Sequence, residues 1–590
     1  MTDTKAAVTS VETDEPLPSG LPDDITEQTD HVTETWVAVE ISFETEKDYK
    51  DGEQLYVYMD AVFRNRNTGT ELILPCFYNG GKAFAVRFAP PEYGVWEYRT
   101  VCETDASLDG KTGTTAANPY RGNLKIYRHG FVKTNGSKYF VYDDGVPFFY
   151  LGDTHWSLFT EETEKSGASG GRQGTKTPHF QYIVDKRVEQ GFTVYQSEPI
   201  GLHAKLSDGS LSEADAEAFK KDDVYFRYIA EKGLVHANAE FFFSGEMNSK
   251  VMNDDRYLEA LSRYWVARFG AYPVMWTLAQ EADNDFYRER GDQKIYDYTN
   301  NPWVKIAEYI HKYDAYGHPL SCHQENTIYT TVTGKGVTQP DADNGGRSVF
   351  LSDEVSGRTG HDFYVSQWQP DLKKQDNGLV PKDYYESKKV AIYYEGRYCN
   401  LWTKDYGARA QSWIAMLNGF AGVGYGAADI WLYNGTYNLD EPSDDGIETV
   451  SVADKAVKWK DAVEFESAYQ QGYMKRFFER FEWWRLEPDF NDGKKFSSKL
   501  GSRGKCVYSA ASIGSDLYVI YMYSKNKASG SVCDMEKDAV YTARWYNPRT
   551  NEYTDIGRVA ADITDENGKP AWTAPERPEA LDYVLILIKE

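Results

Sequence analysis

The feature that most constrains this chain is its hydrophobic pattern between residues 148 and 431. Short apolar runs of strand character alternate there with amphipathic stretches of helical period, which is typical of βα units that build a parallel sheet. The helical stretches, among them HFQYIVDKRVEQG and DRYLEALSRYWVARFG, mostly end near a glycine, as helix C-termini often do. The strand runs are 148–156, 192–199, 234–243, 274–283, 319–324, 362–369, 390–398 and 422–431.

Eight βα units over about 280 residues match the usual size of a (β/α)8 barrel. A doubly wound open sheet is the rival fold, but it normally needs fewer strands and a glycine-rich first turn, and the sequence has neither. The pattern therefore predicts a (β/α)8 TIM barrel.

On both sides of this region the pattern returns to alternation of apolar and polar residues. QLYVYMDAVFRN and GVWEYRTVCE on one side, and LYVIYMYS and YVLILIKE on the other, are separated by turn residues, which indicates short strands of β-sandwiches. The predicted fold is multidomain, α/β plus all-β. Its parts are an acidic, disordered leader at 1–33, an N-terminal β-sandwich at 34–127, the barrel at 128–490 and a C-terminal β-sandwich at 491–590.

Composition limits the partners of the protein. The formal net charge is -26 without a long basic run to offset it, so nucleic acid and anionic membrane surfaces are not expected to bind. The 45 Tyr and 15 Trp are side chains with an apolar ring and a polar handle, suited to stacking on sugars, although packing between domains explains most of them. A neutral carbohydrate fits this composition better than a charged polymer.

The cysteines and the hydropathy of the chain bear on metal sites, disulfides and location. The six cysteines have no C-x-x-C and no metal-ligand spacing, so no zinc site, other metal or cofactor is predicted. Cys76 with Cys102, or Cys506 with Cys533, could pair within a sandwich. No signal peptide is visible at the N-terminus and no apolar stretch has the length of a membrane span, so a soluble protein is expected. A cytoplasmic location is favoured, unless a signal peptide has been removed.

Chemistry in a (β/α)8 barrel takes place where the strands end at their carboxyl side. All eight predicted strands end in polar or aromatic residues, whereas chance would leave several ending in plain turn residues. In chain order these residues are Asp153, His155, Trp156, Gln196, Glu198, Asn238, Glu240, Gln280, Glu281, Asp283, His323, Tyr364, Gln367, Trp368, Glu395, Arg397, Asp429 and Trp431.

Two of these carboxylates fit one reaction especially well. Glu281 ends the fourth strand run, in WTLAQEAD, and Glu395 ends the seventh, in YYEGRY; these ends face each other across a barrel mouth. A glycosidase needs a carboxylic acid that protonates the leaving oxygen and a carboxylate that attacks the sugar or activates water, and a separation of about 5–5.5 Å between them predicts retention. We expect Arg397 or a tyrosine hydroxyl to hold Glu395. The competing interpretations are a solvated strand end for Glu281 and a simple Glu395–Arg397 ion pair.

The motifs AQE and YYEGRY resemble those of clan A of the retaining glycoside hydrolases. More narrowly, FFYLGDTHW together with the upstream NPYRGNLKIYRHGFVKTNGSKYFVYDDGVPF resembles the apiosidase-like family, often described with a putative collagen-binding domain. The resemblance covers nearly everything from about residue 34 onward and implies an N-terminal β-sandwich, a (β/α)8 barrel and a C-terminal β-sandwich. Some members of the family have Asp after Gly-Gly where this chain has Glu281 after Gln280, which leaves the sugar open.

The resemblance also implies roles at the barrel mouth. Glu281 becomes the acid/base and Glu395 the nucleophile, while Gln280 would bind the 2-hydroxyl of the sugar and Tyr364 would orient Glu395. His323 would lie near the acid/base. Asp153 could instead cap a helix, and His323 and Tyr364 could be core residues. The expected substrate-binding residues are Asp153, His155, Trp156, Gln196, Asn238, Gln280, His323, Tyr364, Trp368, Arg397 and Trp431.

Together these patterns predict a retaining O-glycosyl hydrolase that acts on a plant or microbial glycan or glycoside. Long connections at 157–180, 325–360 and 432–455 would wall off a pocket, which favours exo action. One alternative is a metal-dependent hydrolase, with ligands drawn from Asp153, His155, His323, His361 and Asp429. Another is a non-catalytic carbohydrate-binding protein. The sandwiches would brace the barrel or form oligomer contacts, so a homo-oligomer is an open alternative.

Overall fold

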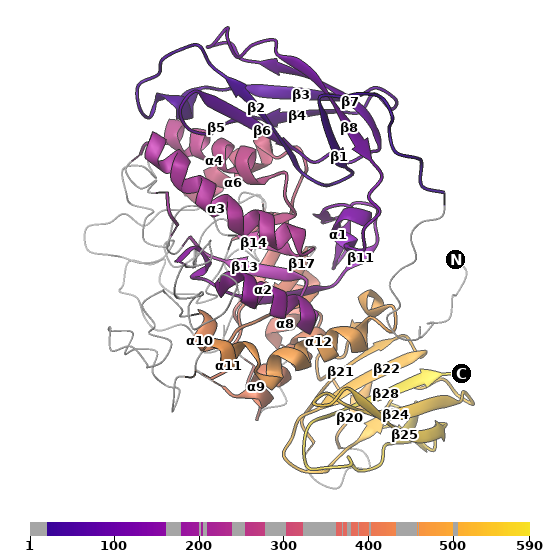
Figure 1. Cartoon of the computed structure of the whole chain (residues 1–590). Coiled ribbons are helices and arrows are strands. Elements are labelled where there is room, and N and C mark those ends of the chain that lie inside the picture. The colour runs from indigo at the N-terminus through magenta and orange to yellow at the C-terminus, as the bar shows by residue number, and fades with distance from the viewer. Residues whose placement is uncertain are drawn as a thin grey trace.

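The computed structural model describes three regions that follow one another along the chain (Figure 1). An all-β region packs against the helices of a central α/β region, and a second all-β region packs against the other end of the same helix layer. The described residues are 20–160, 179–199, 202–204, 209–238, 254–277, 302–322, 361–368, 370–373, 379–387, 389–400, 403–431, 457, 459–499 and 506–590.

The N-terminal region is built from two sheets that face each other. One has the strand order β1-β8-β7-β3-β4 and the other β2-β6-β5. Phe63 on β3 stacks on Phe88 of β6 with ring centroids 3.9 Å apart, so apolar side chains from both sheets form the core between them. The elements are β1 (His31–Glu34), β2 (Val39–Glu44), η1 (Glu53–Tyr56), β3 (Asp60–Asn65), β4 (Glu71–Pro75), β5 (Phe77–Tyr78), β6 (Ala83–Phe88), β7 (Gly94–Val101) and β8 (Thr112–Asn118).

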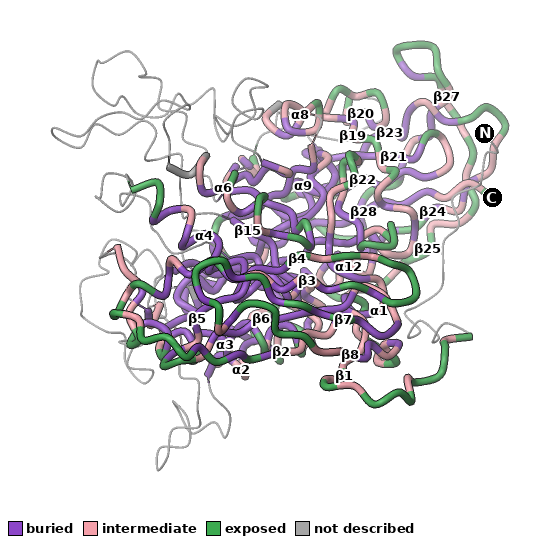
Figure 2. The backbone as a smooth tube through the Cα atoms, turned by 90° about the horizontal axis from the view of Figure 1, so that it is seen from above, coloured by how far each residue is buried: buried purple, intermediate pink, exposed green. Residues whose placement is uncertain are grey.

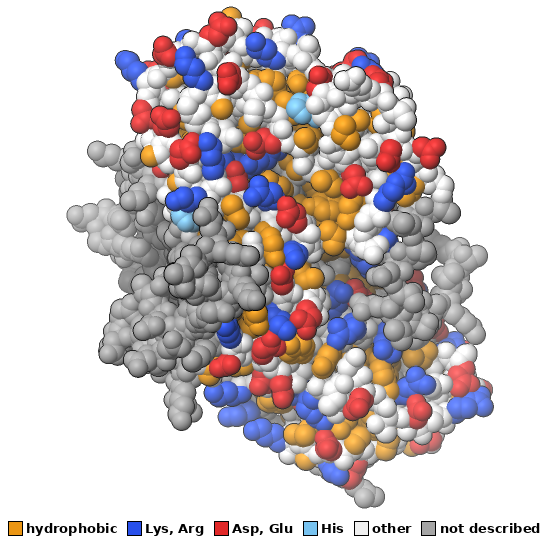
Figure 3. Space-filling model, viewed as in Figure 1, with side chains coloured by type: hydrophobic (Ala, Val, Ile, Leu, Met, Phe, Trp, Pro, Cys, Tyr) orange, Lys and Arg blue, Asp and Glu red, His pale blue; other side chains and the backbone are white. Residues whose placement is uncertain are grey.

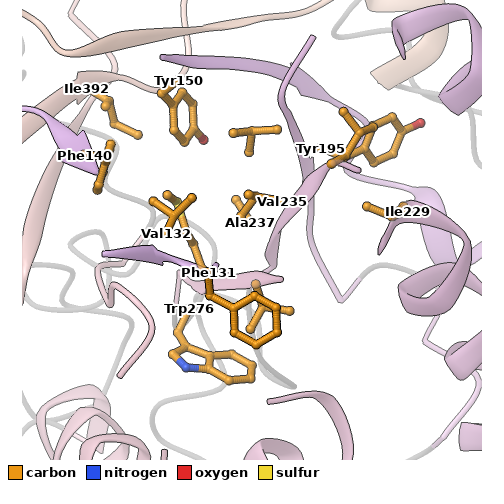
Figure 4. Close-up of a cluster of buried hydrophobic side chains, with 14 of the residues drawn as sticks. Phe131, Val132, Phe140, Tyr150, Tyr195, Ile229, Val235, Ala237, Trp276 and Ile392 are labelled. Carbon is orange, nitrogen blue, oxygen red and sulfur yellow. The ribbon is translucent and has the colours of Figure 1, made fainter. Parts of the chain in front are cut away.

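A short helix and a small antiparallel sheet connect this region to the central one. They are α1 (Lys125–Arg128) and the strands β9 (Val132–Lys133), β10 (Phe140–Tyr142) and β11 (Pro147–Phe148). Phe140 of β10 packs beside Tyr150 and Ile392 from two strands of the central sheet (Figure 4). The small sheet therefore covers the amino-terminal end of the central strands, opposite the end where they carry polar residues.

The central region holds a curled sheet of parallel strands in the order β15-β14-β13-β12-β18-β17-β16. The strands are short and fully buried, as expected for a parallel sheet covered by helices. Figure 2 shows buried chain around β15, the strand of this sheet that it labels. They are β12 (Tyr150–Thr154), β13 (Val194–Ser197), β14 (Val235–Asn238), β15 (Val274–Trp276), β16 (Phe363–Ser366), β17 (Val390–Tyr393) and β18 (Gly422–Tyr425).

Residues 319–322 lie between the two edge strands of this sheet. Leu320 forms a parallel bridge with Trp276 of β15, and the N–H of Asp362 donates to the carbonyl of Leu320 at 2.8 Å. The hydroxyl of Ser321 donates to the carbonyl of Phe363 on β16. The segment that was predicted as the fifth strand thus joins both edges by backbone and side-chain hydrogen bonds.

Helices surround the curled sheet. They are α2 (His179–Gln190), α3 (Glu213–Glu231), α4 (Asp255–Phe269), α6 (Pro302–Tyr313), α8 (Leu379–Glu386) and α9 (Asp405–Leu417), with the short η2 (Leu158–Thr160). Ser212 and Asp215 form a capping box that starts α3, which satisfies N–H groups that the first turn would leave unpaired. Among the described helices none is long and apolar enough to cross a membrane.

Helices and a second pair of sheets complete the chain. The helices are α10 (Ala428–Trp431), α11 (Trp459–Val463), α12 (Glu466–Phe478) and η8 (Trp483–Arg485). The sheets have the orders β19-β21-β22-β28-β24-β25 and β20-β23-β27-β26. Their strands are β19 (Glu487–Pro488), β20 (Phe496–Ser497), β21 (Tyr508–Ile513), β22 (Leu517–Met522), β23 (Ser531–Val532), β24 (Tyr541–Asn547), β25 (Glu552–Val559), β26 (Ile563–Thr564), β27 (Pro570–Thr573) and β28 (Tyr583–Lys589).

A buried arginine–aspartate pair fastens each all-β region to the helices. At the N-terminal junction, Arg87 of β6 contacts both carboxylate oxygens of Asp223 on α3 at 2.9 and 2.6 Å. At the C-terminal junction, Arg409 of α9 contacts both oxygens of Asp582 at 2.8 Å each. Bidentate pairs of this kind fix orientation as well as contact. The two all-β regions are therefore held in defined positions on the helix layer.

Two sequence expectations need correction. The eighth strand was predicted to run over 422–431, but β18 ends at Tyr425 and residues 428–431 form α10, so Asp429 and Trp431 lie on a helix and not at a strand end. The run GVGYGAAD has no branched residue after Val423 that would favour extending the strand. The six cysteines are buried free thiols, so neither suggested disulfide is formed.

Candidate active site

Glu395 lies just beyond the carboxyl end of β17, the strand next to the edge strand β16 in the curled sheet. The N–H groups of Tyr394 and Glu395 both point to the carbonyl of Ser366 on β16, at 2.9 and 3.4 Å. Two successive donors opposite one acceptor form an irregularity like a β-bulge, which re-aims the side chain that follows. The backbone thereby turns Glu395 away from the strand alternation as β17 ends.

The carboxylate of Glu395 is held at both oxygens by neutral donors. Gln367 Nε2 donates to Oε2 at 2.7 Å, and the hydroxyl of Tyr398 donates to Oε1. Glu395 is only 8% exposed. Two donors on a nearly buried carboxylate fix its rotamer and leave its oxygens as acceptors, which suits a group that must attack in one direction.

Tyr398 links Glu395 to Trp156. Its hydroxyl accepts a hydrogen bond from the Trp156 indole Nε1 at 2.7 Å and donates its own proton to Glu395. Burial, and then the charge of Glu395, raise the pKa of Tyr398 well above 10. The hydroxyl therefore keeps its proton at neutral pH and remains a donor.

Gln411 on α9 clamps the turn that carries these groups. Its Oε1 accepts from the N–H of Arg397 at 3.0 Å and its Nε2 donates to the carbonyl of the same residue at 2.9 Å. Gly396 permits this approach, because a Cβ there would lie 2.4 Å from Tyr393 Oη and 2.7 Å from Gln411 Nε2. The backbone from Glu395 to Tyr398 is thus fixed from the helix layer.

Asp153 occupies a different place from the one expected. Asp153 follows Gly152 on β12, so its side chain points to the opposite face of the sheet, toward helix α2. Its Oδ2 lies 2.8 Å from Arg187 Nε, and both side chains are fully buried. Burial raises the pKa of Asp153 to about 6, and Arg187 opposes that rise. The structure thus gives Asp153 a partner between strand and helix, on the side of the sheet away from its interior.

His155 and Asn238 are also engaged by the surrounding layer. His155 Nδ1 lies 2.6 Å from the hydroxyl of Tyr195, and burial lowers the pKa of His155 to about 3, so it is neutral. Asn238 accepts from Trp265 Nε1 of α4 at 3.1 Å through its side-chain oxygen. Both side chains complete the packing around the strand ends.

Gln196 points into the curled sheet. Its Nε2 donates to the carbonyl of Tyr394 at 3.1 Å, and the missing side chains of Gly152 and Gly424 make room for it, since a Cβ at either would lie 2.1 or 2.7 Å from its Oε1. Gln196 therefore fills the interior of the sheet below Glu395.

The remaining predicted residues fall into three groups. Tyr364 is buried on β16 under the ammonium of Lys389, and Trp368 packs beside Tyr393 and Phe420. Arg397 is exposed beside the clamped turn. Glu281, Gln280 and His323 lie outside the described residues, as does the side chain of Trp431.

The sequence singled out Glu395 as a candidate but not the groups that the structure places around it. It foresaw a tyrosine hydroxyl near Glu395 without naming Tyr398, although this tyrosine ends the motif YYEGRY. It placed Gln367 at the rim without a role. Gln411 gave no signal, because it contacts the turn from a helix that begins ten residues after Glu395.

Of the residues proposed for a metal site, His323 lies outside the described residues and the others contact other side chains. Among the described part of the chain no group of three His, Cys, Asp or Glu residues could hold a metal ion. Asp429 accepts from Asn400 Nδ2 at 2.9 Å and from the N–H of Val457, and His361 Nε2 lies 3.2 Å from Cys322 Sγ.

Comparisons with solved structures identify the fold. A structure titled "putative glycoside hydrolase from Bacteroides vulgatus" has a TM-score of 0.63 at 15% identity, over 95% of this chain and 100% of that one. A family 5 glycoside hydrolase from the same organism has a TM-score of 0.54 at 17% identity, over 78% and 94%. At these identities the likeness concerns the fold alone. No curated protein matches the chain.

Family models divide the chain as the structure does. "Domain of unknown function (DUF5060)" matches residues 32–103, and "Putative collagen-binding domain of a collagenase" matches 501–588, each within one all-β region. The model described as "Apiosidase-like, catalytic domain" matches residues 134–485, which is more than half of the chain and includes the central sheet with Glu395. The chain therefore belongs to the apiosidase-like family.

Proposed function

We propose that the protein is a retaining, exo-acting glycoside hydrolase in which Glu395 is the nucleophile and Glu281 the acid/base. Membership in the apiosidase-like family supports a glycosidase function. The observation that carries the nucleophile is the carboxylate of Glu395 at the carboxyl edge of the sheet, with Gln367 and Tyr398 donating to its two oxygens. This edge is where parallel α/β barrels place their chemistry.

We further propose that the curled sheet closes into a (β/α)8 barrel through residues 319–322. The hydrogen bonds of this segment to Trp276 and to residues 362–363 support closure. Closure would bring the end of the strand run that contains Glu281 to the same mouth as Glu395. The assignment of Glu281 rests on the sequence motif AQE and on family resemblance.

The proposed reaction has two steps. A carboxylate oxygen of Glu395 attacks the anomeric carbon while the glycosidic C–O bond breaks, and the leaving oxygen takes a proton from Glu281. Water then attacks the anomeric carbon and gives its proton to Glu281, which releases Glu395 and the sugar. Tyr398 holds Glu395 in line for the first step and keeps its own proton throughout.

A screen of aryl glycosides tests this proposal. The panel contains hexosides, pentopyranosides and furanosides, with apiosides included because the matching family is named for them, and NMR follows the anomer of the first product. We expect hydrolysis with retention. Glu395→Gln should abolish turnover, while Glu487→Gln, an exposed glutamate on β19, serves as the matched control. Wild-type rates in Glu395→Gln, with intact fold, would remove Glu395 from the reaction and leave the sugar-binding alternative.

A further inference from the structure

A groove runs between the carboxyl edge of the central sheet and the C-terminal all-β region. Its volume is about 660 Å³, within the range of about 300–1,000 Å³ usual for sites that bind small ligands. One wall comes from the connection after β16 and the turn after β17, and the other from the loop after β22. The lining residues are Asp371, Leu372, Lys373, Arg397, Tyr406, Val507, Tyr523, Ser524, Lys525 and Asn526.

The first wall is tied directly to the candidate nucleophile. Arg397 stands two residues after Glu395, and both backbone polar groups of Arg397 are bound by Gln411. The guanidinium is exposed at the groove while Glu395 is nearly buried beside it. Arg397 thus connects the groove along the backbone to Glu395, which is not itself a lining residue.

The second wall is a structured loop. Tyr406 at the start of α9 donates its hydroxyl to the carbonyl of Tyr523 at 2.6 Å, which joins the two walls at one point. Within the loop, the buried guanidinium of Arg577 donates to Ser524 Oγ at 2.8 Å and to the carbonyl of Ala528 at 3.1 Å. The C-terminal region therefore presents Lys525 from a loop with internal support.

The charges in the groove differ in sign from the protein as a whole. The chain carries a net charge of -26, and on the face shown in Figure 3 acidic and basic side chains are interspersed over the described surface. The groove gathers Arg397, Lys373 and Lys525 against the acidic residue Asp371. Exposed cations that converge on one concave surface attract an anionic group, and an arginine there suits planar or tetrahedral oxyanions.

We propose that this groove binds an anionic substituent, a carboxylate or a sulfate ester, on the sugar unit next to the one that Glu395 attacks. The proposal rests on the function proposed above for Glu395 and adds the substrate class: an acidic oligosaccharide or glycoside. It also gives the C-terminal region a part in substrate recognition, since Lys525 comes from that region.

Calorimetric titration of the full-length chain tests the groove without turnover. The Glu395→Gln variant is titrated with uronic-acid oligosaccharides, sulfated oligosaccharides and neutral xylo-oligosaccharides of matched length. The same titrations are made with Lys373→Met and Lys525→Met added together. Lys527→Met is the matched control, because Lys527 is an exposed lysine in the same loop that is not among the lining residues.

We expect an anionic series to bind at least about tenfold more tightly than the neutral one, and the two groove substitutions to remove that preference. Affinity should fall as salt is raised from about 0.05 M to about 0.3 M, because screening shortens the reach of exposed charges. Tighter binding of uronates than of sulfated sugars would identify the bound group as a carboxylate. Tighter binding of sulfated sugars would identify it as a sulfate ester.

Three outcomes would overturn the inference: equal affinity for the anionic and neutral series, an equal effect of the paired groove substitutions and of Lys527→Met, or no binding of any anionic probe. None of these outcomes bears on whether Glu395 is the nucleophile, since turnover is not measured. Conversely, an active Glu395→Gln variant would overturn the proposed mechanism without deciding whether the groove prefers anionic ligands.

Discussion

At the scale of single residues, Tyr398 determines how Glu395 is presented. Its hydroxyl donates to the Glu395 carboxylate and accepts from Trp156. Tyr398→Phe removes both bonds with little change in shape. We expect kcat to fall about 10- to 100-fold, because a hydrogen bond to a charged group is worth about 1.5–3 kcal/mol. Steady-state kinetics on the best aryl glycoside measures the change.

Tyr469→Phe provides the control for this substitution. Tyr469 also donates its hydroxyl to a glutamate, Glu464, but on the surface of α12. Its removal should leave kcat within about twofold of wild type and barely affect unfolding. Equal kinetics in the two variants would show that the Tyr398 hydrogen bond does not contribute to the reaction.

The sequence could single out Glu395 as a candidate, because a carboxylate directly after a buried apolar run stands out in a pattern. It could not predict the set of contacts around it. Gln411 reaches Arg397 from a separate helix, and Trp156 reaches Tyr398 from the end of the first central strand. Those contacts depend on the curvature of the sheet and on helix packing, which a local pattern does not encode.

At the scale of elements, the Asp153–Arg187 pair joins β12 to α2 in a fully buried setting. Asp153→Asn would leave the guanidinium of Arg187 buried without its counter-ion. We expect the free energy of unfolding to drop by about 3–5 kcal/mol, the usual cost of breaking one partner of a buried pair. Denaturant titration followed by circular dichroism measures it.

Asp185→Asn on the same helix is the control. Asp185 pairs with Lys232 at 2.7 Å in a partly exposed position, so its loss should cost less than about 1 kcal/mol. If Asp153→Asn were instead as stable as wild type and raised KM strongly, Asp153 would belong to the sugar pocket, as the sequence analysis first expected.

Element positions were more predictable than their ends. The apolar runs located every strand of the central sheet, because buried parallel strands are continuously hydrophobic. Strand lengths were overestimated: β18 stops at Tyr425 although the predicted run continued to Trp431. Asp153 follows Gly152 on β12, so the two residues face opposite sides of the sheet. Whether the partner of Asp153 is a sugar or Arg187 depends on where α2 packs, which the sequence pattern does not give.

At the scale of the whole molecule, two buried histidines make stability depend on pH. Burial lowers the pKa of His155 and of His236 to about 3, against about 6.5 in an unfolded chain. Between these values the unfolded state binds more protons, so the free energy of unfolding falls as pH drops below about 6.5. Each histidine contributes at most about 1.4 kcal/mol per pH unit.

Substitution can show how much His236 contributes to the dependence of the unfolding free energy on pH. His236→Gln removes one titrating group and should reduce the slope of unfolding free energy against pH between about 4 and 6.5. Asp153, with its pKa raised by burial to about 6, acts in the opposite direction between about pH 4 and 6, since its protonated form is favoured in the folded state. A slope unchanged by His236→Gln would contradict the assignment.

The three-region architecture was visible in the sequence as a change of period from two to 3.6 and back. The contacts that fasten the regions to one another were not visible, because Arg409 and Asp582 are 173 residues apart and meet in a buried pair.

The substitution Asp582→Asn should loosen the C-terminal region, because it removes the charge that pairs with Arg409. Hydrogen exchange should then increase in α9 and in β28 before the central sheet is affected.

In the proposed reaction Glu395 forms a covalent bond to the sugar. Incubation with a 2-deoxy-2-fluoro glycoside bearing a good leaving group, followed by proteolysis and mass spectrometry, tests it most directly. We expect a stable adduct of one fluorosugar on the peptide that contains Glu395, with activity lost in proportion to labelling. An adduct on another carboxylate, or hydrolysis with inversion and without any adduct, would contradict it.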